Sequence, residues 1–423
     1  MSRAIPKNVV VPKLHVMARS SSIGDRHQVV CDFKLITPMF GGGVEPREHD
    51  PLTPVRGTAI RGHLRFWWRA TIGSHFATSK ELASEEARIW GDMDHKSPVV
   101  VCAHVIDCGK RTPCATFPSG QKYPSFTVGW PAYALFPFQG KPETGAAYAI
   151  SDLRFKLTLS HPVNLEKDVK TALRAWTLFG GLGARTRRGC GALSCDQFNP
   201  KTSKDVAVWL AQSQFPLREW PTIPSHLQAK PAEKNSLQAW GDGIASLREF
   251  RQGVEIGRNR SHTSTRPGRS RWPEPEAIRR ATTKRSMKYQ RLANIPDTHY
   301  PRAELGLPII FHFNDPSDPR DTELLPFYEG KVSDRFASPL VLKPLALADA
   351  SFCPILFKLQ SPPPDRVELK SCTSKQKIEE ASVRDGSLAR DHASPLFERS
   401  ESGSALEAFL KFAETKGFSV IRP

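Results

Sequence analysis

The sequence lacks several features that would assign it to a familiar class. None of its eight cysteines stands in a CxxC pair, so a zinc ribbon is not expected. It contains no stretch of about 18 consecutive apolar residues, and its first residues show no apolar segment with a small-residue cleavage site. The GxxxxGK[ST] pattern of triphosphate-binding loops is also absent. We therefore expect a reduced, cytoplasmic protein without a membrane segment.

Metal-ligating residues come together in only one part of the sequence. Cys102, Cys108 and Cys114 recur every six residues with His104 nearby, but no fourth ligand is evident. We expect neither a metal nor a cofactor.

The charge of the chain points to an acidic partner. The 423 residues carry a net charge of +17, with a pI near 9.6. A basic balance of this size is typical of proteins that bind nucleic acid, although charge alone also serves solubility. Positions 251–291 hold twelve Lys or Arg against three Glu, so over half of the excess lies in about a tenth of the chain. The length predicts two or three domains.

The stretch WTLFGGLGARTRRGCGAL, from Trp176 to Leu193, contains the most informative motif. We name its central part, 180–191, the arginine–glycine loop. Glycines leave main-chain N–H groups open to phosphate oxygens, and arginines add fork-shaped donors for the same anions. The alternative is a helix C-cap followed by a solvated turn. The residues predicted to face RNA here are Gly180, Gly181, Gly183, Arg185, Arg187, Arg188 and Gly189.

A second glycine-rich turn follows the first predicted strand, 27–36. This first glycine bend consists of Gly41, Gly42 and Gly43, and it can lie beside the arginine–glycine loop in a folded domain.

The helix predicted over 56–72 is basic along one side. Its apolar stripe contains Ile60, Leu64, Trp67, Trp68 and Thr71. No acidic residue occurs between Arg56 and Glu81, so the arginines have no carboxylate one helical turn away. RNA contact and a solvated face both explain this pattern. The candidate RNA contacts are Arg56, Arg61, Arg65 and Arg69.

The order of elements predicts an α+β fold. Strands at 97–106, 151–160 and 191–198 and a helix from about 164 complete a β-α-β-β-α-β series, the order of ferredoxin-like domains and of the RNA-recognition module. A proline- and aromatic-rich insertion over about 111–148 interrupts the series, and its aromatic rings can either stack on unpaired bases or pack on their own domain.

We divide the chain into a first domain, 1–199, a connecting segment, 200–235, with one helix, and a second domain, 236–423. The second domain contains a basic loop, 257–271, and a polar segment, 361–404, that we expect to be mostly loop. Charge density adds Arg258, Arg260, Arg269 and Arg271 to the candidate RNA contacts. We treat Trp67, Trp68, Trp272 and Pro273 as packing residues.

The motifs carry a family resemblance. GGLGARTRRGCGAL is similar to the glycine-rich signature of the RAMP superfamily, the repeat-associated RNA-binding proteins of CRISPR systems. Further blocks resemble the subunit family conventionally numbered one in the Cmr, or type III-B, CRISPR effector complex. In chain order they are ITPMFGGG, PVRGTAIRGHLRFWWRA, EARIWG, GRSRWPEPEAIRR, PRAELGLPIIFHF and RFASPLVLKP, between Ile36 and Pro344.

The resemblance implies two tandem ferredoxin-like domains in a bacterial or archaeal protein. It implies a non-catalytic subunit toward the 3′ end of the guide RNA, next to another RAMP subunit, that helps to bind guide and target RNA. Some RAMP proteins instead cut guide precursors by metal-independent acid–base chemistry, which needs a paired base and acid. The candidates by residue type alone are His15, His27, His49, His63 and His75.

Overall fold

The computed structural model describes residues 25–423 except for positions 44, 46, 120, 122, 329 and 365 and segments 261–267, 285–299 and 383–403. His15 therefore lies outside the described residues. The fold is mixed α+β, and the strands of its sheets pair antiparallel. No helix within the described ranges is long and apolar enough to span a membrane.

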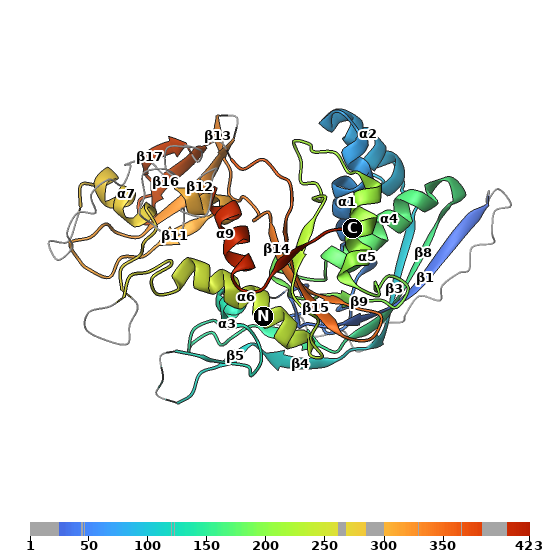
Figure 1. Cartoon of the computed structure of the whole chain (residues 1–423), viewed down its shortest axis with the longest axis horizontal. Coiled ribbons are helices and arrows are strands. Elements are labelled where there is room, and N and C mark those ends of the chain that lie inside the picture. The colour runs from blue at the N-terminus through green and yellow to red at the C-terminus, as the bar shows by residue number, and fades with distance from the viewer. Residues whose placement is uncertain are drawn as a thin grey trace, which may run out of the picture.

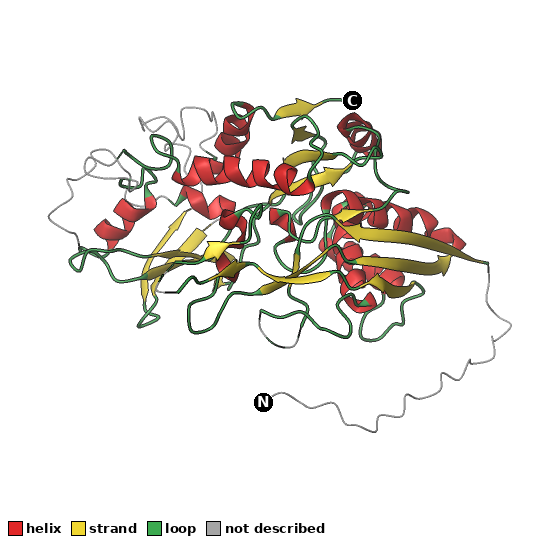
Figure 2. Ribbon diagram, turned by 90° about the horizontal axis from the view of Figure 1, so that it is seen from below, coloured by secondary structure: helices red, strands yellow, loops and turns green. Residues whose placement is uncertain are grey.

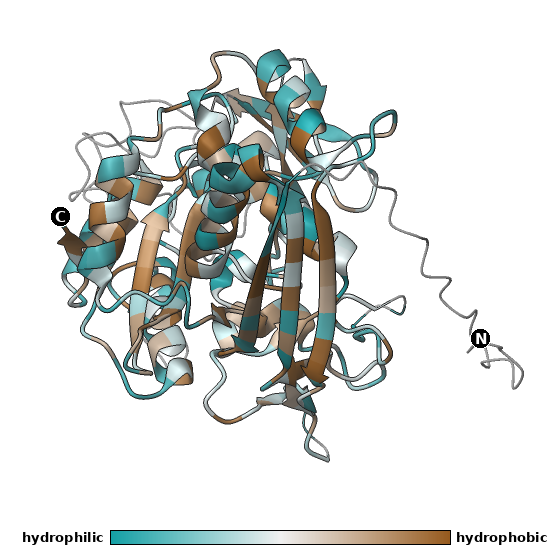
Figure 3. Cartoon of the chain, turned by 90° about the vertical axis from the view of Figure 1, so that its right-hand side faces the viewer, coloured by the Kyte–Doolittle hydropathy of each residue, from teal (hydrophilic) through white to brown (hydrophobic). Residues whose placement is uncertain are grey.

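The first sheet has the strand order β3-β8-β1-β9. Its three long strands end together at the right of Figure 1, and in Figure 3 they are banded along their length by alternating hydropathy. The predicted fourth strand, 191–198, is much shorter in the structure. The strands are β1 (Arg26–Leu35), β3 (Val100–Asp107), β8 (Arg154–Pro162) and β9 (Leu193–Ser194).

Helices α1 (Gly57–Ala70) and α4 (Glu166–Phe179) cover one face of this sheet and pack against each other. The apolar stripe predicted on the first helix is confirmed, because Ile60, Leu64, Trp67, Trp68 and Thr71 are all buried.

The core beneath the two helices is aromatic. Phe33 of β1 stacks on Phe155 of β8 with 5.1 Å between ring centroids, and Trp176 of α4 lies 5.3 Å from Phe33. Trp68 donates from Nε1 to Asp168 Oδ1 at 2.7 Å, which ties α1 to α4. The two helices that flank this layer are α2 (Ser79–Trp90) and α5 (Ser203–Ser213).

The outer face of the first sheet is open among the described residues. Strand β3 was predicted to be buried, and this is wrong. It is an edge strand with Val100 and Ile106 about half exposed. A β-branched run indicates a strand, but it does not tell a central strand from an edge strand.

The insertion over 111–148 packs against Phe40 of the preceding chain. Phe138 stacks on Phe40 with 4.3 Å between centroids, and Trp130 meets the same ring edge-on, whereas Tyr123 and Phe136 are exposed. The elements of this layer are β2 (Met39–Phe40), β4 (Lys110–Pro113), β5 (Ala115–Thr116), β6 (Ser125–Phe126), α3 (Ala132–Leu135) and β7 (Tyr148–Ser151).

The second sheet has the strand order β14-β15-β10-β18, with helices α6 (Ser236–Gln252) and α9 (Ala405–Glu414) between its strands in the chain. Strand β10 lies within the predicted connecting segment. Sequence analysis missed it because only three residues pair. The strands are β10 (Leu227–Ala229), β14 (Leu340–Ala346), β15 (Phe352–Lys358) and β18 (Ser419–Ile421).

A third sheet stands at the left of Figure 1, beside helix α7 (Glu274–Ala281). The prediction that 361–404 is mostly loop is wrong for its first half, because β16 and β17 pair there. Segment 383–403 lies outside the described residues. The strands are β11 (Ile309–Phe311), β12 (Thr322–Tyr328), β13 (Lys331–Val332), β16 (Arg366–Ser371) and β17 (Lys377–Ser382).

Helices and sheets alternate across the molecule when it is seen from below (Figure 2).

Trp272 and Pro273 are buried at the start of α7, so the prediction that they are packing residues is confirmed, as it is for Trp67 and Trp68.

The paired rings of the first core generate a stability prediction. Phe155→Ala removes a fully buried ring and leaves a cavity beside Phe33, so we expect the free energy of unfolding to fall by about 3–5 kcal/mol. Urea denaturation followed by tryptophan fluorescence measures this change. Ile106→Ala on the open face is the control, and we expect it to cost less than about 1 kcal/mol. Equal losses in the two variants would contradict the assignment of inner and outer faces.

Candidate nucleic-acid interface

The first glycine bend and the arginine–glycine loop lie side by side, as predicted. Ala184 N donates to Phe40 O at 2.8 Å, and Gly191 N donates to Pro38 O at 2.9 Å. The loop therefore runs along the chain that leads into the first bend, and both belong to one surface feature.

Close main-chain contact explains several of the glycines. A Cβ on Gly183 would lie 2.3 Å from Phe40 O, and one on Gly191 would lie 2.0 Å from Leu182 O; both residues also have positive φ. No other residue type allows the chain to double back so tightly. Part of the glycine content thus serves packing.

Only part of the two bends is open to solvent. Gly42 and Gly183 are exposed, whereas Gly180, Gly181 and Gly189 are buried, which corrects their prediction as RNA contacts. A Cβ on Gly180 would meet Trp67, and one on Gly189 would meet Trp240. Phosphate cannot reach main-chain amides that are covered by tryptophan rings.

Arg187 and Arg188 face inward, which corrects their prediction as phosphate contacts. Arg187 donates from Nη1 to Ser338 O at 2.6 Å, and Arg188 donates from Nη1 to Leu340 O at 2.5 Å. Burial lowers the pKa of Arg188 to about 9. These guanidiniums satisfy carbonyl groups at the start of β14 and join the two halves of the molecule.

Lys343 makes a similar connection from β14. Its side chain is buried, and Nζ donates to Gly180 O at 2.9 Å and to Thr177 O at 3.3 Å. The acceptors are carbonyls at the C-terminal end of α4, where a helix lacks internal donors and favours a cation. Lys343 thus holds the start of the arginine–glycine loop.

Arg65 and Arg69 are ion-paired, although no carboxylate lies one helical turn away from them on α1. Both contact Glu86 Oε1, from Arg65 Nε at 2.5 Å and from Arg69 Nη1. Glu86 lies on α2 and is largely buried. Because this partner lies on α2, the pattern of residues within α1 does not indicate it.

Arg56 and Arg61 lie at the N-terminal half of α1. Arg56 is exposed and donates to Gly42 O at 2.8 Å, which joins it to the first glycine bend. Arg61 is half-buried and donates to Val99 O at 3.1 Å. No side chain caps the N-terminus of α1 and its first turn holds no acid, so no carboxylate of that turn compensates the positive end of the helix next to the bend.

The basic loop is described at 257–260 and 268–271 only. Arg269 pairs with buried Glu276 at 2.6 Å, and its contact with RNA stays a prediction. Arg258 donates to Gly268 O at 3.4 Å, and Arg271 donates to Glu255 O. The exposed Arg260 lies 3.3 Å from Glu255, so the described ends of the loop are held mainly by each other.

Arg185 differs from its neighbours in the loop. Its backbone is left-handed, with φ of 57°, and its Nε is buried without a hydrogen-bond partner. Burial lowers the pKa of Arg185, and repulsion by Arg335 and Arg251 lowers it further. No carboxylate of the described residues pairs with any of these three arginines.

Sequence analysis did not assign Arg251 or Arg335 to the site. Arg251 lies at the end of α6 and Arg335 lies just before β14, so both come from the second half of the chain. Their only signals in the sequence were the basic segment that begins at Arg251 and the block RFASPLVLKP. Arg185, which both of these cations repel, can be relieved of that repulsion by binding an anion.

The candidate histidines do not form an acid–base pair at this surface. His63 stacks on Trp176, and burial lowers its pKa. His27 Nδ1 lies 2.8 Å from Glu166 Oε2, and its ring stands 6.2 Å from that of His161, which is fully buried. Burial also lowers the pKa of His49, and His75 lies against Phe215. Among the described residues no three His, Cys, Asp or Glu side chains come together as a metal site.

Comparison with known proteins gives the following matches. Residues 32–194 match the family model of the RAMP superfamily. The chain is 27% identical over 158 residues to the CRISPR system Cmr subunit Cmr1-1 of Pyrococcus furiosus, a match that covers 36% of this chain and 44% of that protein. It is 26% identical over 183 residues to subunit Cmr1-2 of the same organism, covering 40% of this chain and 94% of the relative. The chain thus spans less than half the length of the first of these relatives.

A solved structure extends the likeness in fold. The crystal structure of Cmr1 from Pyrococcus furiosus in its apo form is similar with a TM-score of 0.51 at 14% sequence identity. The likeness covers 94% of this chain and 99% of that one. At this identity the likeness extends to the fold alone.

The inward position of Arg188 generates a stability prediction. Arg188→Ala leaves Leu340 O and Ser338 Oγ without their donor, so we expect the free energy of unfolding to fall by about 2–4 kcal/mol. Arg56→Ala is the matched control, with an expected loss below about 0.5 kcal/mol because Arg56 is exposed. Guanidinium denaturation measures both. An unchanged midpoint for Arg188→Ala would contradict its internal role.

Lys343 generates a pH prediction. Burial lowers its pKa from 10.5 to about 7, so between these values the unfolded chain binds a proton that the folded protein has lost. The contribution of Lys343 to the free energy of unfolding should therefore rise as the pH increases from about 7 towards 10.5. We expect the stability difference between wild type and Lys343→Met to move in favour of the wild type over this window, as measured by urea denaturation at several pH values. A constant difference would show that the two carbonyls keep the lysine protonated.

Proposed function

We propose that this chain, whose residues 32–194 match the family model of the RAMP superfamily, is an RNA-binding subunit of a type III-B CRISPR effector complex. The relatives that support this proposal are named Cmr subunits. In the proposed role the chain lies toward the 3′ end of the guide RNA, next to another RAMP subunit. It helps to bind the guide and to capture complementary target RNA for antiviral defence.

The proposed RNA contacts combine open amides and cations without carboxylate partners. The observation that carries the proposal is the exposed edge where the first glycine bend meets the arginine–glycine loop, flanked by Arg185, Arg251 and Arg335. Main-chain amides and guanidiniums bind phosphates without reading the base, so sequence specificity would come from pairing between guide and target. The proposed contacts are Gly41, Gly42, Gly43, Arg56, Gly183, Arg185, Arg251 and Arg335.

We also propose that the chain contains two tandem ferredoxin-like domains. The support is that the first and second sheets share one strand order relative to the chain, β3-β8-β1-β9 and β14-β15-β10-β18, with helices at corresponding places. In this arrangement the second domain begins at or before β10, upstream of position 236, and the third sheet is an insertion in it. Both halves then contribute arginines to the same RNA-binding surface.

In the proposed role the subunit is non-catalytic. The surface around the two bends holds donors for phosphate, whereas cleavage of RNA also needs a base near the 2′-hydroxyl and an acid near the leaving oxygen. A metal-independent endoribonuclease is the second candidate, and the contact of His27 with Glu166 favours it. Its test is incubation of labelled guide precursor with the protein, with and without EDTA. Discrete cleavage that is lost in His27→Ala would establish that activity.

The RNA-binding proposal is tested through salt dependence. Arg185→Ala, Arg251→Ala and Arg335→Ala should each weaken binding of fluorescein-labelled single-stranded RNA, and should lower the slope of log K against log salt by about 0.7 per lost contact. Fluorescence anisotropy with several unrelated RNA sequences measures this, and each variant should lose similar affinity for all of them.

The matched control is Arg88→Ala, which removes an exposed arginine from α2. Losses as large in Arg88→Ala as in the site variants would show that net charge alone binds RNA. Losses confined to one RNA sequence would contradict backbone contact and indicate base recognition. Retention of full affinity by all three site variants would remove this surface from the RNA-binding site.

A further inference from the structure

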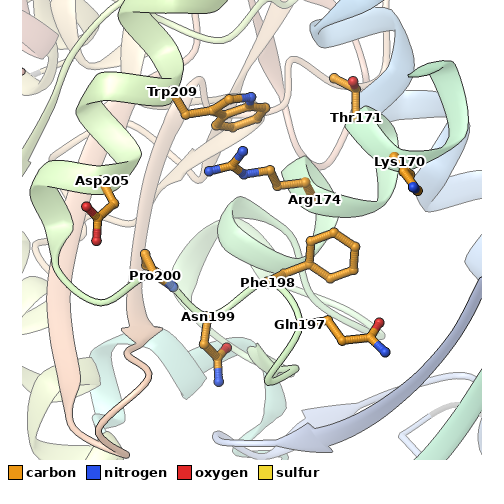
Figure 4. Close-up of a pocket in the computed structure, with 9 residues that line it drawn as sticks. All are labelled: Lys170, Thr171, Arg174, Gln197, Phe198, Asn199, Pro200, Asp205 and Trp209. Atoms are coloured by element: carbon orange, nitrogen blue, oxygen red, sulfur yellow. The ribbon is translucent and has the colours of Figure 1, made fainter. Parts of the chain in front are cut away.

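A pocket lies between α4 and the start of α5, away from the two bends. Its volume is about 430 Å³, within the usual range of about 300–1,000 Å³ for small-molecule sites. Figure 4 shows Arg174 projecting into this space below Trp209, with Asp205 on one side and Phe198 on the other. None of its lining residues belongs to either bend.

Arg174 is the main charged group of the pocket. Its guanidinium lies over the ring of Trp209, 4.6 Å from the ring centroid, and Trp209 in turn stacks on Phe179 at 6.1 Å. Stacking fixes the plane of the guanidinium and leaves the N–H donors at its edge available. Arg174 makes no ion pair or hydrogen bond within the described part of the chain. Burial lowers its pKa and the charge of Asp205 offsets this only in part, so an anion would compensate the remaining charge.

The remaining walls supply apolar surface and hydrogen-bonding groups. Phe198 is half-buried and presents an aromatic wall. Asn199 is held in place because Nδ2 donates to Ser194 Oγ at 2.9 Å and Oδ1 accepts from Cys195 N at 3.1 Å, which leaves one amide hydrogen for a ligand. Asp205 accepts hydrogen bonds from Thr202 through Oδ2, and its Oδ1 has no hydrogen-bond donor among the residues that the structure describes, so Oδ1 can accept one from a ligand.

These groups match the parts of a nucleotide. The N–H groups at the edge of an arginine can hydrogen-bond to a phosphate. The plane of an arginine and an aromatic ring can stack on the faces of a base, and amide and carboxylate groups held in place can hydrogen-bond to base edges or ribose hydroxyls. We infer that this pocket binds one unpaired ribonucleotide, with its phosphate on Arg174 and its base against Phe198. The inference deepens the proposed function, because it adds a separate contact for a nucleotide turned out of the strand.

Isothermal titration of the full chain with adenosine monophosphate tests the inference. Binding should be saturable at one site per chain, and Arg174→Ala should weaken it at least tenfold. Arg174→Lys should recover only part of the affinity, because lysine cannot offer two parallel donors. Arg88→Ala, the matched loss of one charge, should leave it unchanged.

A second variant separates binding from stability. Thr171 lines the pocket and makes no side-chain hydrogen bond in the described structure, so Thr171→Phe should fill the pocket while preserving the stack of Arg174 on Trp209. This variant should also lose nucleotide binding with little change in melting temperature. Unchanged affinity in both Arg174→Ala and Thr171→Phe would overturn the inference.

Two other probes identify the ligand class. Inorganic phosphate that binds as tightly as adenosine monophosphate would overturn the nucleotide assignment in favour of a simple anion site. An acidic peptide that competes as well as the nucleotide would overturn it in favour of a protein contact. A wild-type chain that binds oligonucleotides but not adenosine monophosphate would contradict the pocket inference alone. A wild-type chain that binds adenosine monophosphate but not oligonucleotides would contradict only the proposed RNA-binding surface.

Discussion

Buried carbonyl groups that are satisfied by cationic side chains hold this molecule together. Arg187 and Arg188 donate from the arginine–glycine loop to carbonyls before and within β14, and Lys343 donates from β14 back to the end of α4. Each carbonyl would otherwise be buried without a donor, at a cost of about 1–3 kcal/mol. The interactions run in both directions across the junction of the two sheets, so the position of the loop depends on both.

These internal contacts change what the net charge of +17 implies about a binding partner. Part of the excess is internal, because Arg187, Arg188 and the buried Lys343 donate to main-chain carbonyls of the protein itself. Arg65 and Arg69 compensate one largely buried glutamate. The positive groups left for a partner are fewer than the composition implies, and their positions are correspondingly more informative. Such groups remain near Arg185 and in the pocket of Arg174.

The sequence predicted features that depend on local periodicity. The apolar stripe of α1 and the strand predicted at 151–160 follow from neighbouring residues, and the predicted bounds agree with those of α1 and β8 within a few positions. Strand β10 was not predicted, because three residues are too few to show the alternation of apolar and polar residues that indicates a strand. Strands β16 and β17 were predicted as loop because they contain many charged residues, which are typical of loops. The partners of Arg65, Arg69 and Arg188 are far along the chain, and no local pattern indicates them.

The pairing of β10 with β18 has a consequence for the order of folding. Leu227 and Ile421 are register partners about 190 residues apart, whereas the strands of the first sheet all lie within the first half of the chain. Non-local pairing of this kind forms slowly, since a long loop must close before any contact compensates for it. On the ribosome the first sheet can assemble while the second still lacks an edge, and β10 then presents unpaired main-chain groups until β18 emerges. The order of synthesis therefore leaves this edge of β10 without its partner strand until the last residues of the chain are made.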